Sequence, residues 1–256
     1  MDTPATESPL SRQLGEGVLA LGLNRPAQRN ALTPELYLAL AQALADADTN
    51  AEVRCVLLFG HGAGFCAGND IGQFAAHGAS TEERPSAHFM RALMALRKPV
   101  VAAVEGHAVG IGATLLLHCD FVYAAQDAQL RFPFVPLGLC PEFASTLLLG
   151  QRVGHARAAE LLLLGEPCDA DQALQLGLVN AVFARGEVLP NATEIARRLA
   201  RLPADALQTS KSLMLAGQTQ ACERQIARER EEFSRLLASD EAQAAFAAFL
   251  ARRGAG

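Results

Sequence analysis

Residues 98–112 have the sequence KPVVAAVEGHAVGIG, an apolar run followed by a turn of small residues. The run Val100–Val104 predicts a buried strand, and a helix is expected from about Gly112. An earlier segment has the same form, because the apolar run 53–59 leads into FCAGND at residues 65–70. Small residues at such turns let a ligand approach the main chain closely. Two such turns side by side would aim two backbone N–H groups at one oxygen, the geometry of an oxyanion hole.

Strands and helices are predicted to alternate along the chain. Thr33-Pro34 indicates a helix start, and leucines 36, 40 and 44 would share one face of that helix. Alternation of this kind indicates an α/β fold with parallel strands and crossover helices. Residues 1–14 are expected to be a loose lead-in and 73–91 a loop. Strands are expected at 18–23, 53–59, 99–104, 120–124 and 178–183, and helices at 156–164, 170–176 and throughout the chain beyond 187.

The composition excludes several classes of protein. The chain has 256 residues, 50% hydrophobic and 19% charged, which is enough to bury a sizeable core. A net charge of −5 and the lack of tryptophan disfavour a nucleic-acid binder, which usually has a basic face. The apolar runs are too short for a membrane span, so no membrane association is expected. The N-terminal residues do not have the pattern of a secretory leader, and a cytoplasmic location is expected.

No metal site is predicted. The six cysteines include no C-x-x-C pair, so neither a zinc site nor a redox dithiol is indicated. His61, His107 and His118 have no ligand-like spacing with other donors and are expected to be turn or packing residues.

Glu142 is the candidate proton carrier. It follows Pro141 among apolar residues, so burial would raise its pKa. The alternative is a glutamate in the first turn of a helix that begins after Pro141, where the helix dipole favours it. The two turns also have simpler interpretations when taken alone. Asn69-Asp70 is typical of an Asx turn or a helix cap, and 110–112 could be a tight turn whose glycines merely allow close packing. A dinucleotide site is poorly indicated, because Leu115 stands where the third glycine is expected.

A series of motifs covers nearly the whole chain. They are Asn24-Arg25-Pro26, Asn30-Ala31-Leu32, 65–70, 98–104, Gly106, 108–112, Cys119-Asp120, Ala170, Ala173, Gly177-Leu178-Val179 and Ser210-Lys211. In this order they resemble the crotonase (enoyl-CoA hydratase/isomerase) superfamily, for which they are jointly specific. The resemblance implies an α/β, crotonase-like spiral of ββα turns with a C-terminal helical trimerisation region. We therefore expect a spiral core with the acyl-CoA site at 1–200 and a helical oligomerisation region at 201–256.

The resemblance also implies the ligand and the residues that hold it. The substrate would be an acyl-CoA thioester, with no separate cofactor because coenzyme A is part of the substrate. The assembly would be a homotrimer or a dimer of trimers. The backbone N–H groups of Asn69 and Ile111 would bind the thioester oxygen. The acyl-CoA-binding residues would be Ala27, Arg29, Ala31, Ala67, Gly68, Asn69, Asp70, Ile71, Gly110, Gly112, Phe134 and Leu137.

Departures from the family pattern indicate the reaction. Hydratases of the family carry two glutamates at the positions of Thr114 and Phe134, so water addition lacks its acid and base here. The Pro-Glu at 141–142 and the Asn at 69 are similar to Δ3,Δ2-enoyl-CoA isomerases of the peroxisomal type. The resemblance therefore implies an isomerase of fatty-acid β-oxidation that uses Glu142 alone. Two alternatives stay open: another crotonase-family reaction (dienoyl isomerisation, thioester hydrolysis or a secondary-metabolism step) or a non-catalytic acyl-CoA-binding subunit.

Overall fold

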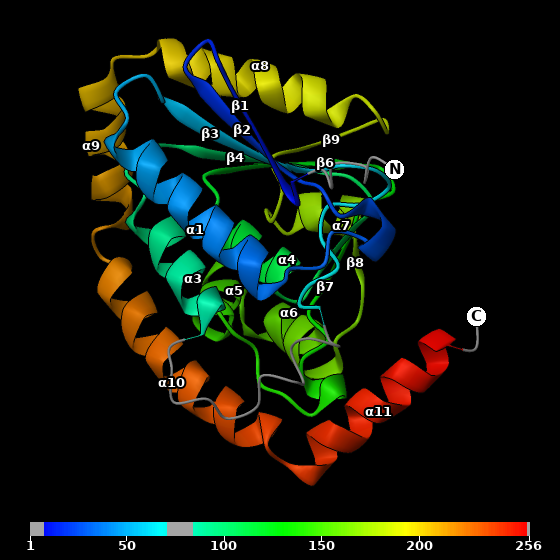
Figure 1. Cartoon of the computed structure of the whole chain (residues 1–256). Coiled ribbons are helices and arrows are strands. Elements are labelled where there is room, and N and C mark those ends of the chain that lie inside the picture. The colour runs from blue at the N-terminus through cyan, green and yellow to red at the C-terminus, as the bar shows by residue number, and fades with distance from the viewer. Residues whose placement is uncertain (1–7, 71–83, 255–256) are drawn as a thin grey trace, which may run out of the picture.

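A large, mainly parallel sheet forms the centre of the molecule (Figure 1). The computed structural model describes residues 8–70 and 84–254. The large sheet has the strand order β1-β2-β3-β4-β6-β9, in which only the β1–β2 pair is antiparallel. A small sheet has the order β5-β7-β8. The strands are β1 (Leu10–Gly15), β2 (Val18–Leu23), β3 (Cys55–Gly60), β4 (Val100–Val104), β5 (His107–Val109), β6 (Phe121–Ala125), β7 (Gln129–Arg131), β8 (Cys168–Asp169) and β9 (Ala181–Phe183).

Helices cover both faces of the large sheet (Figure 1). Alternate residues of the central strands point to opposite faces: Leu57 and Val101 pack with α8, whereas Val56 and Val100 pack with α1 and α3. Strands buried on both faces need continuous apolar runs, which is why β3 and β4 were predictable. The helices are α1 (Pro34–Thr49), α3 (Pro85–Ala95), α4 (Ile111–Thr114), α5 (Ser145–Val153), α6 (His155–Ala159), α7 (Ala170–Gln175), α8 (Val188–Arg201), α9 (Ala204–Leu215), α10 (Thr219–Leu237) and α11 (Asp240–Gly254).

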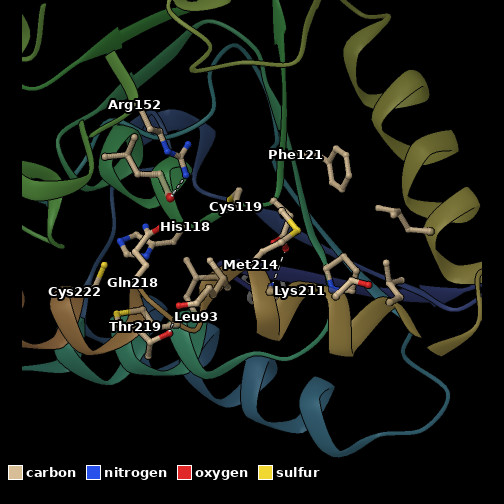
Figure 2. Close-up of a pocket in the computed structure, with 18 residues that line it drawn as sticks. Leu93, His118, Cys119, Phe121, Arg152, Lys211, Met214, Gln218, Thr219 and Cys222 are labelled. Carbon is tan, nitrogen blue, oxygen red and sulfur yellow. Dashed lines mark hydrogen bonds and ion pairs between the residues drawn. The ribbon is translucent and has the colours of Figure 1, made fainter. Parts of the chain in front are cut away.

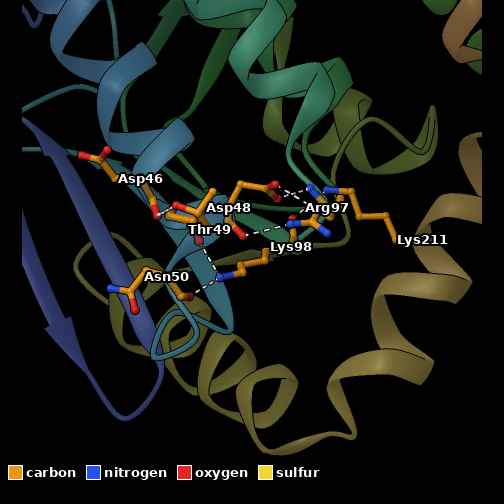
Figure 3. A network of polar contacts seen from close by, with 8 residues as sticks. Asp46, Asp48, Thr49, Asn50, Arg97, Lys98 and Lys211 are labelled. Carbon is orange, nitrogen blue, oxygen red and sulfur yellow. Dashed lines mark hydrogen bonds and ion pairs between the residues drawn. The ribbon is translucent and has the colours of Figure 1, made fainter.

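Helix α1 is fixed at both ends. The Thr33 hydroxyl accepts a hydrogen bond from the Leu36 N–H at 3.3 Å, with proline at the first helical position, as predicted. At the other end, the Lys98 ammonium donates to the carbonyls of Ala47 and Asn50 (Figure 3). A cation at a helix C-terminus stabilises the free carbonyls and the negative end of the helix dipole. The contact joins the end of α1 to the residues that lead into β4.

The C-terminal part is helical, as predicted. Helices α8 to α11 follow one another, α10 packs against α5, and α11 reaches the 3₁₀ turn at Val135–Leu137 (Figure 1). On α9, the side chains of Leu213 and Met214 are 72% and 80% exposed. Apolar side chains with such exposure are the kind that an oligomer covers, and oligomerisation through this region stays a prediction.

Two predictions about local structure were wrong. Residues 10–14, expected to be part of a loose lead-in, belong to β1, which pairs with β2 along its whole length. Leu10 is the buried apolar residue of that strand, so no alternating pattern marks it. Residues 85–91, expected to be part of the loop 73–91, belong to α3, which buries Phe89, Met90 and Leu93. Residues 73–83 of that predicted loop lie outside the described residues. Among the described residues, no helix is both long enough and apolar enough to cross a membrane.

Candidate active site

The two small-residue turns lie side by side. Cys66 and Ala108 form a parallel bridge, with hydrogen bonds from the Val109 N–H to the Cys66 carbonyl at 2.9 Å and from the Cys66 N–H to the His107 carbonyl at 3.0 Å. Asn69 lies three residues after Cys66, and Ile111 lies three residues after Ala108. Over residues 8–70 and 84–254, neither of these two backbone N–H groups donates to a backbone carbonyl. Both are therefore available to an outside acceptor.

Glycine allows the close approach of these turns. At Gly68, where φ is +90°, an added Cβ would lie 2.8 Å from the Val109 carbonyl oxygen. At Gly112, it would lie 2.7 Å from the Cys66 carbonyl oxygen. Any larger residue at either position would push the turns apart. The small residues thus set the spacing between the segments that carry Asn69 and Ile111.

A third segment, residues 25–32, completes the backbone framework. The Ala67 N–H donates to the Arg29 carbonyl at 3.0 Å, and the Leu32 N–H donates to the Gly68 carbonyl at 2.8 Å. The Arg25 guanidinium pairs with the Asp70 carboxylate at 3.1 Å. The structure therefore brings the predicted acyl-CoA-binding segments 27–31 and 67–70 together. Ile71, also predicted there, lies outside the described residues.

Glu142 lies beside this framework. Its carboxyl group interacts with the Asn69 side-chain amide, while its Oε1 atom is buried without a hydrogen-bond partner among the described residues. Burial, followed by the negative charge of Glu229, raises the pKa of Glu142 to about 8, whereas Arg84 and the Asn69 amide act to lower it. Helix α5 begins at Ser145, so the alternative that placed Glu142 in a first helical turn was wrong.

Tyr37 is a site residue that the sequence analysis missed. Its hydroxyl donates to the Asn69 Oδ1 at 2.6 Å, which leaves the Asn69 NH₂ group to face Glu142. Tyr37 is buried on α1 beside Leu36 and Leu40. Within the leucine pattern of that helix, it has the appearance of an ordinary core residue. Asn69 consequently offers both a backbone N–H and an oriented side chain to the site.

Neutral side chains line the part of the site near Gly110. An added Cβ on Gly110 would lie 4.0 Å from the Phe134 ring, which is buried. Thr114 is also buried, and its hydroxyl donates to the Ile111 carbonyl at 3.4 Å. Leu137 is partly buried against the core. A narrow cavity of about 40 Å³ next to Glu142 is lined largely by α3 and α10, including Met90 and Phe233.

A second cavity, of about 370 Å³, lies apart from these residues (Figure 2). It is lined by side chains of α9 and α10 and by the segment 117–121, and none of the predicted site residues contributes to it. His118 at its edge is neutral, since burial lowers its pKa to about 4. Across the part of the chain that the structure describes, no group of three His, Cys, Asp or Glu side chains is arranged to hold a metal ion.

Comparison with known proteins agrees with this framework. A family model described as enoyl-CoA hydratase/isomerase matches residues 13–255. The chain belongs to the enoyl-CoA hydratase/isomerase family. This crotonase-superfamily membership was predicted from the motifs at 65–70 and 98–112, and the mixed α/β fold agrees with it.

Curated members of the family share about a third of their residues with this chain. The 2,3-dehydroadipyl-CoA hydratase of Escherichia coli K12 is 36% identical over 95% of both chains. The 1,2-epoxyphenylacetyl-CoA isomerase of the same organism is 37% identical, over 93% of this chain and 94% of the relative. Enoyl-CoA delta isomerase 2 of Rattus norvegicus is 35% identical over 77% of this chain and 52% of the relative.

Solved structures similar to this chain have the same fold. OdaA of Pseudomonas aeruginosa is 44% identical with a TM-score of 0.92, covering 95% of this chain and 99% of that chain. An enoyl-CoA hydratase/isomerase from Pseudoalteromonas atlantica T6c is 39% identical, also with a TM-score of 0.92, covering 96% and 98%. The substrate of the family is an acyl-CoA thioester, so the site must accept a thioester carbonyl and the carbon atoms next to it.

Proposed function

We propose that this family member is a Δ3,Δ2-enoyl-CoA isomerase of fatty-acid β-oxidation. The observation that carries the proposal is the Glu142 carboxyl group: it lies against Asn69, its Oε1 atom is buried without a hydrogen-bond partner among the described residues, and its pKa is raised to about 8. A general base of this pKa titrates near neutral pH, where proton transfer in both directions is effective.

The reaction needs one proton carrier and one site for negative charge. The thioester oxygen would accept hydrogen bonds from the Asn69 and Ile111 backbone N–H groups. The Glu142 carboxylate removes a proton from C2 of the 3-enoyl thioester, and the electron pair passes to that oxygen as a dienolate. The same carboxyl group then returns a proton to C4, which leaves the double bond between C2 and C3. Each oxyanion donor typically contributes about 3 kcal/mol to such a transition state.

Two positions favour this reaction over hydration. Thr114 and Phe134 stand where the family's hydratases carry their two glutamates, and both are buried and neutral here. A phenyl ring beside Gly110 also keeps water away from the dienolate. The rat relative named enoyl-CoA delta isomerase 2 supports the same reaction. A relative named as a hydratase, 36% identical over 95% of the chain, makes water addition the activity to test beside it.

The test is incubation with 3-hexenoyl-CoA, following the conjugated 2-enoyl thioester by its ultraviolet absorbance. Turnover by the wild type that is lost in Glu142→Gln supports the proposal, and Glu166→Gln, an exposed glutamate, is the matched control. Turnover that persists in Glu142→Gln removes Glu142 from the mechanism. Hydration of 2-hexenoyl-CoA without isomerisation of 3-hexenoyl-CoA would indicate that the protein is a hydratase. Binding without any conversion would indicate a non-catalytic subunit.

A further inference from the structure

Glu142 is followed by a turn of unusual backbone conformation. Phe143 and Ala144 both have positive φ, of 61° and 55°, and neither is glycine. A left-handed conformation of this kind is unfavourable for residues other than glycine and persists only where surrounding contacts impose it. The turn sets the direction in which the Glu142 side chain leaves the backbone. The contacts that hold the turn are therefore relevant to catalysis.

Two side chains from different parts of the fold hold this turn. From the core side, the His118 imidazole donates to the Phe143 carbonyl at 2.8 Å and stacks on the Phe143 ring. From α10, Glu229 accepts hydrogen bonds at both carboxylate oxygens. Its Oε2 accepts from the Ala144 N–H at 2.6 Å, and its Oε1 accepts from the Thr146 N–H at 3.1 Å and from the Thr146 hydroxyl.

Glu229 is placed differently from the other glutamates of α10. Its side chain is buried, with 5% exposed, on a helix whose neighbouring glutamates are exposed. It satisfies N–H groups at the start of α5, which begins at Ser145 directly after the turn. Three donors directed at one carboxylate favour its ionised form and act against burial, the larger effect, which raises the pKa of Glu229 above its usual value. A negative charge is thus placed next to the proton carrier.

We propose that Glu229 is a positioning residue for the proton transfer: it holds the turn at Phe143–Ala144 and keeps a negative charge beside the Glu142 carboxyl. The inference rests on the proposed function of Glu142. It means that the site is incomplete without α10, although 201–256 was assigned from the sequence to oligomerisation alone. Two buried carboxyl groups with different partners divide their roles, since one stays ionised and the other carries the proton.

The charged groups around Glu142 determine in which direction its pKa should move when Glu229 is replaced. Glu229 favours the protonated form of Glu142, whereas Arg84 before α3 favours the carboxylate. Among the described residues, the other titratable groups near this region include Tyr37 of α1, Cys140 in the same segment, and Arg230 and Glu232 of α10. Replacing Glu229 by a neutral residue removes a like charge, so the Glu142 carboxyl should titrate at lower pH.

The experiment measures Glu142 in the full-length protein without substrate. The ¹³C resonance of its carboxyl is assigned by its loss in Glu142→Gln and titrated in the wild type, in Glu229→Gln and in the exposed control Glu231→Gln. We expect the midpoint in Glu229→Gln to fall by about one pH unit. Exchange of the Ala144 and Thr146 amide hydrogens should be about tenfold faster, the factor for one lost hydrogen bond. With 3-hexenoyl-CoA, kcat should fall about 100-fold with little change in KM, as for a small misplacement of a catalytic group.

A Glu229→Gln protein with the midpoint and amide exchange of Glu231→Gln would overturn the proposal. If Glu229→Gln does not fold, Glu229→Asp keeps the charge but is one methylene too short. Faster Ala144 exchange in that variant supports the proposal, and wild-type exchange contradicts it. Absence of isomerase activity in the wild type would instead count against the proposed function, because the carboxyl titration and the amide exchange need no turnover.

Discussion

The Glu142 carboxyl should make the protein less stable as the pH rises. Its pKa is 4.5 in an exposed reference state and about 8 in the folded protein. The folded state therefore binds this proton more tightly than the unfolded state does. The stabilisation that this provides is complete below the reference pKa and is lost as the pH rises through about 8.

Replacement of Glu142 by glutamine removes this dependence while keeping the shape of the side chain. From these two pKa values, the free energy of unfolding of the wild type should fall by at most about 4 kcal/mol, relative to that of Glu142→Gln, between about pH 5 and about pH 9. Entry of water to the carboxylate would reduce that figure. At about 2 °C per kcal/mol for a chain of this size, the difference in Tm should grow by roughly 8 °C over the same range.

The assay is thermal unfolding of wild type, Glu142→Gln and the exposed control Glu166→Gln across that pH range. Glu142→Gln should be inactive but more stable than the wild type at alkaline pH, and the control should follow the wild type. A difference between Glu142→Gln and wild type that stays constant with pH would refute the reasoning, because it would mean that the carboxyl group does not titrate with a raised pKa.

Three further predictions concern activity on 3-hexenoyl-CoA. Because the base must be ionised in the free enzyme, kcat/KM should rise about tenfold per pH unit below the Glu142 pKa and level off above it, as a pH profile will show. Tyr37→Phe removes the hydrogen bond to the Asn69 carboxamide and should lower kcat about tenfold, with KM nearly constant in steady-state kinetics. Arg25→Met breaks the partly exposed pair with Asp70 and should raise KM about fivefold. Added salt screens the same pair in the wild type, so the difference in KM between the two proteins should become smaller as salt is added.

The parts of the fold that the sequence predicted well are those with local signals. Continuous apolar runs marked β3 and β4 because both faces of these strands are buried. Thr33 and Pro34 marked the start of α1 by capping chemistry. The pairing of the turns at 65–70 and 110–112 was also predictable, since they come after β3 and β4, which are neighbouring parallel strands.

What the sequence could not show depends on contacts between distant residues. The left-handed turn at Phe143–Ala144 contains no glycine, so no residue type indicates it. Glu229 contacts that turn from a helix far along the chain and resembles the exposed glutamates around it. Tyr37 lies among the leucines of α1, so the sequence does not indicate that its hydroxyl donates to Asn69. These are tertiary contacts, and no spacing rule encodes them.

The transfer of one hydrogen within the substrate tests the central claim most directly. 3-Hexenoyl-CoA labelled with deuterium at C2 is converted in ordinary water, and the label in the product is located by mass spectrometry and NMR. If the buried Glu142 alone carries the proton, a substantial share of the label should move from C2 to C4 in early turnover. Product that carries only solvent hydrogen at C4 from the first turnovers onward would contradict a single enclosed carboxyl group as the carrier.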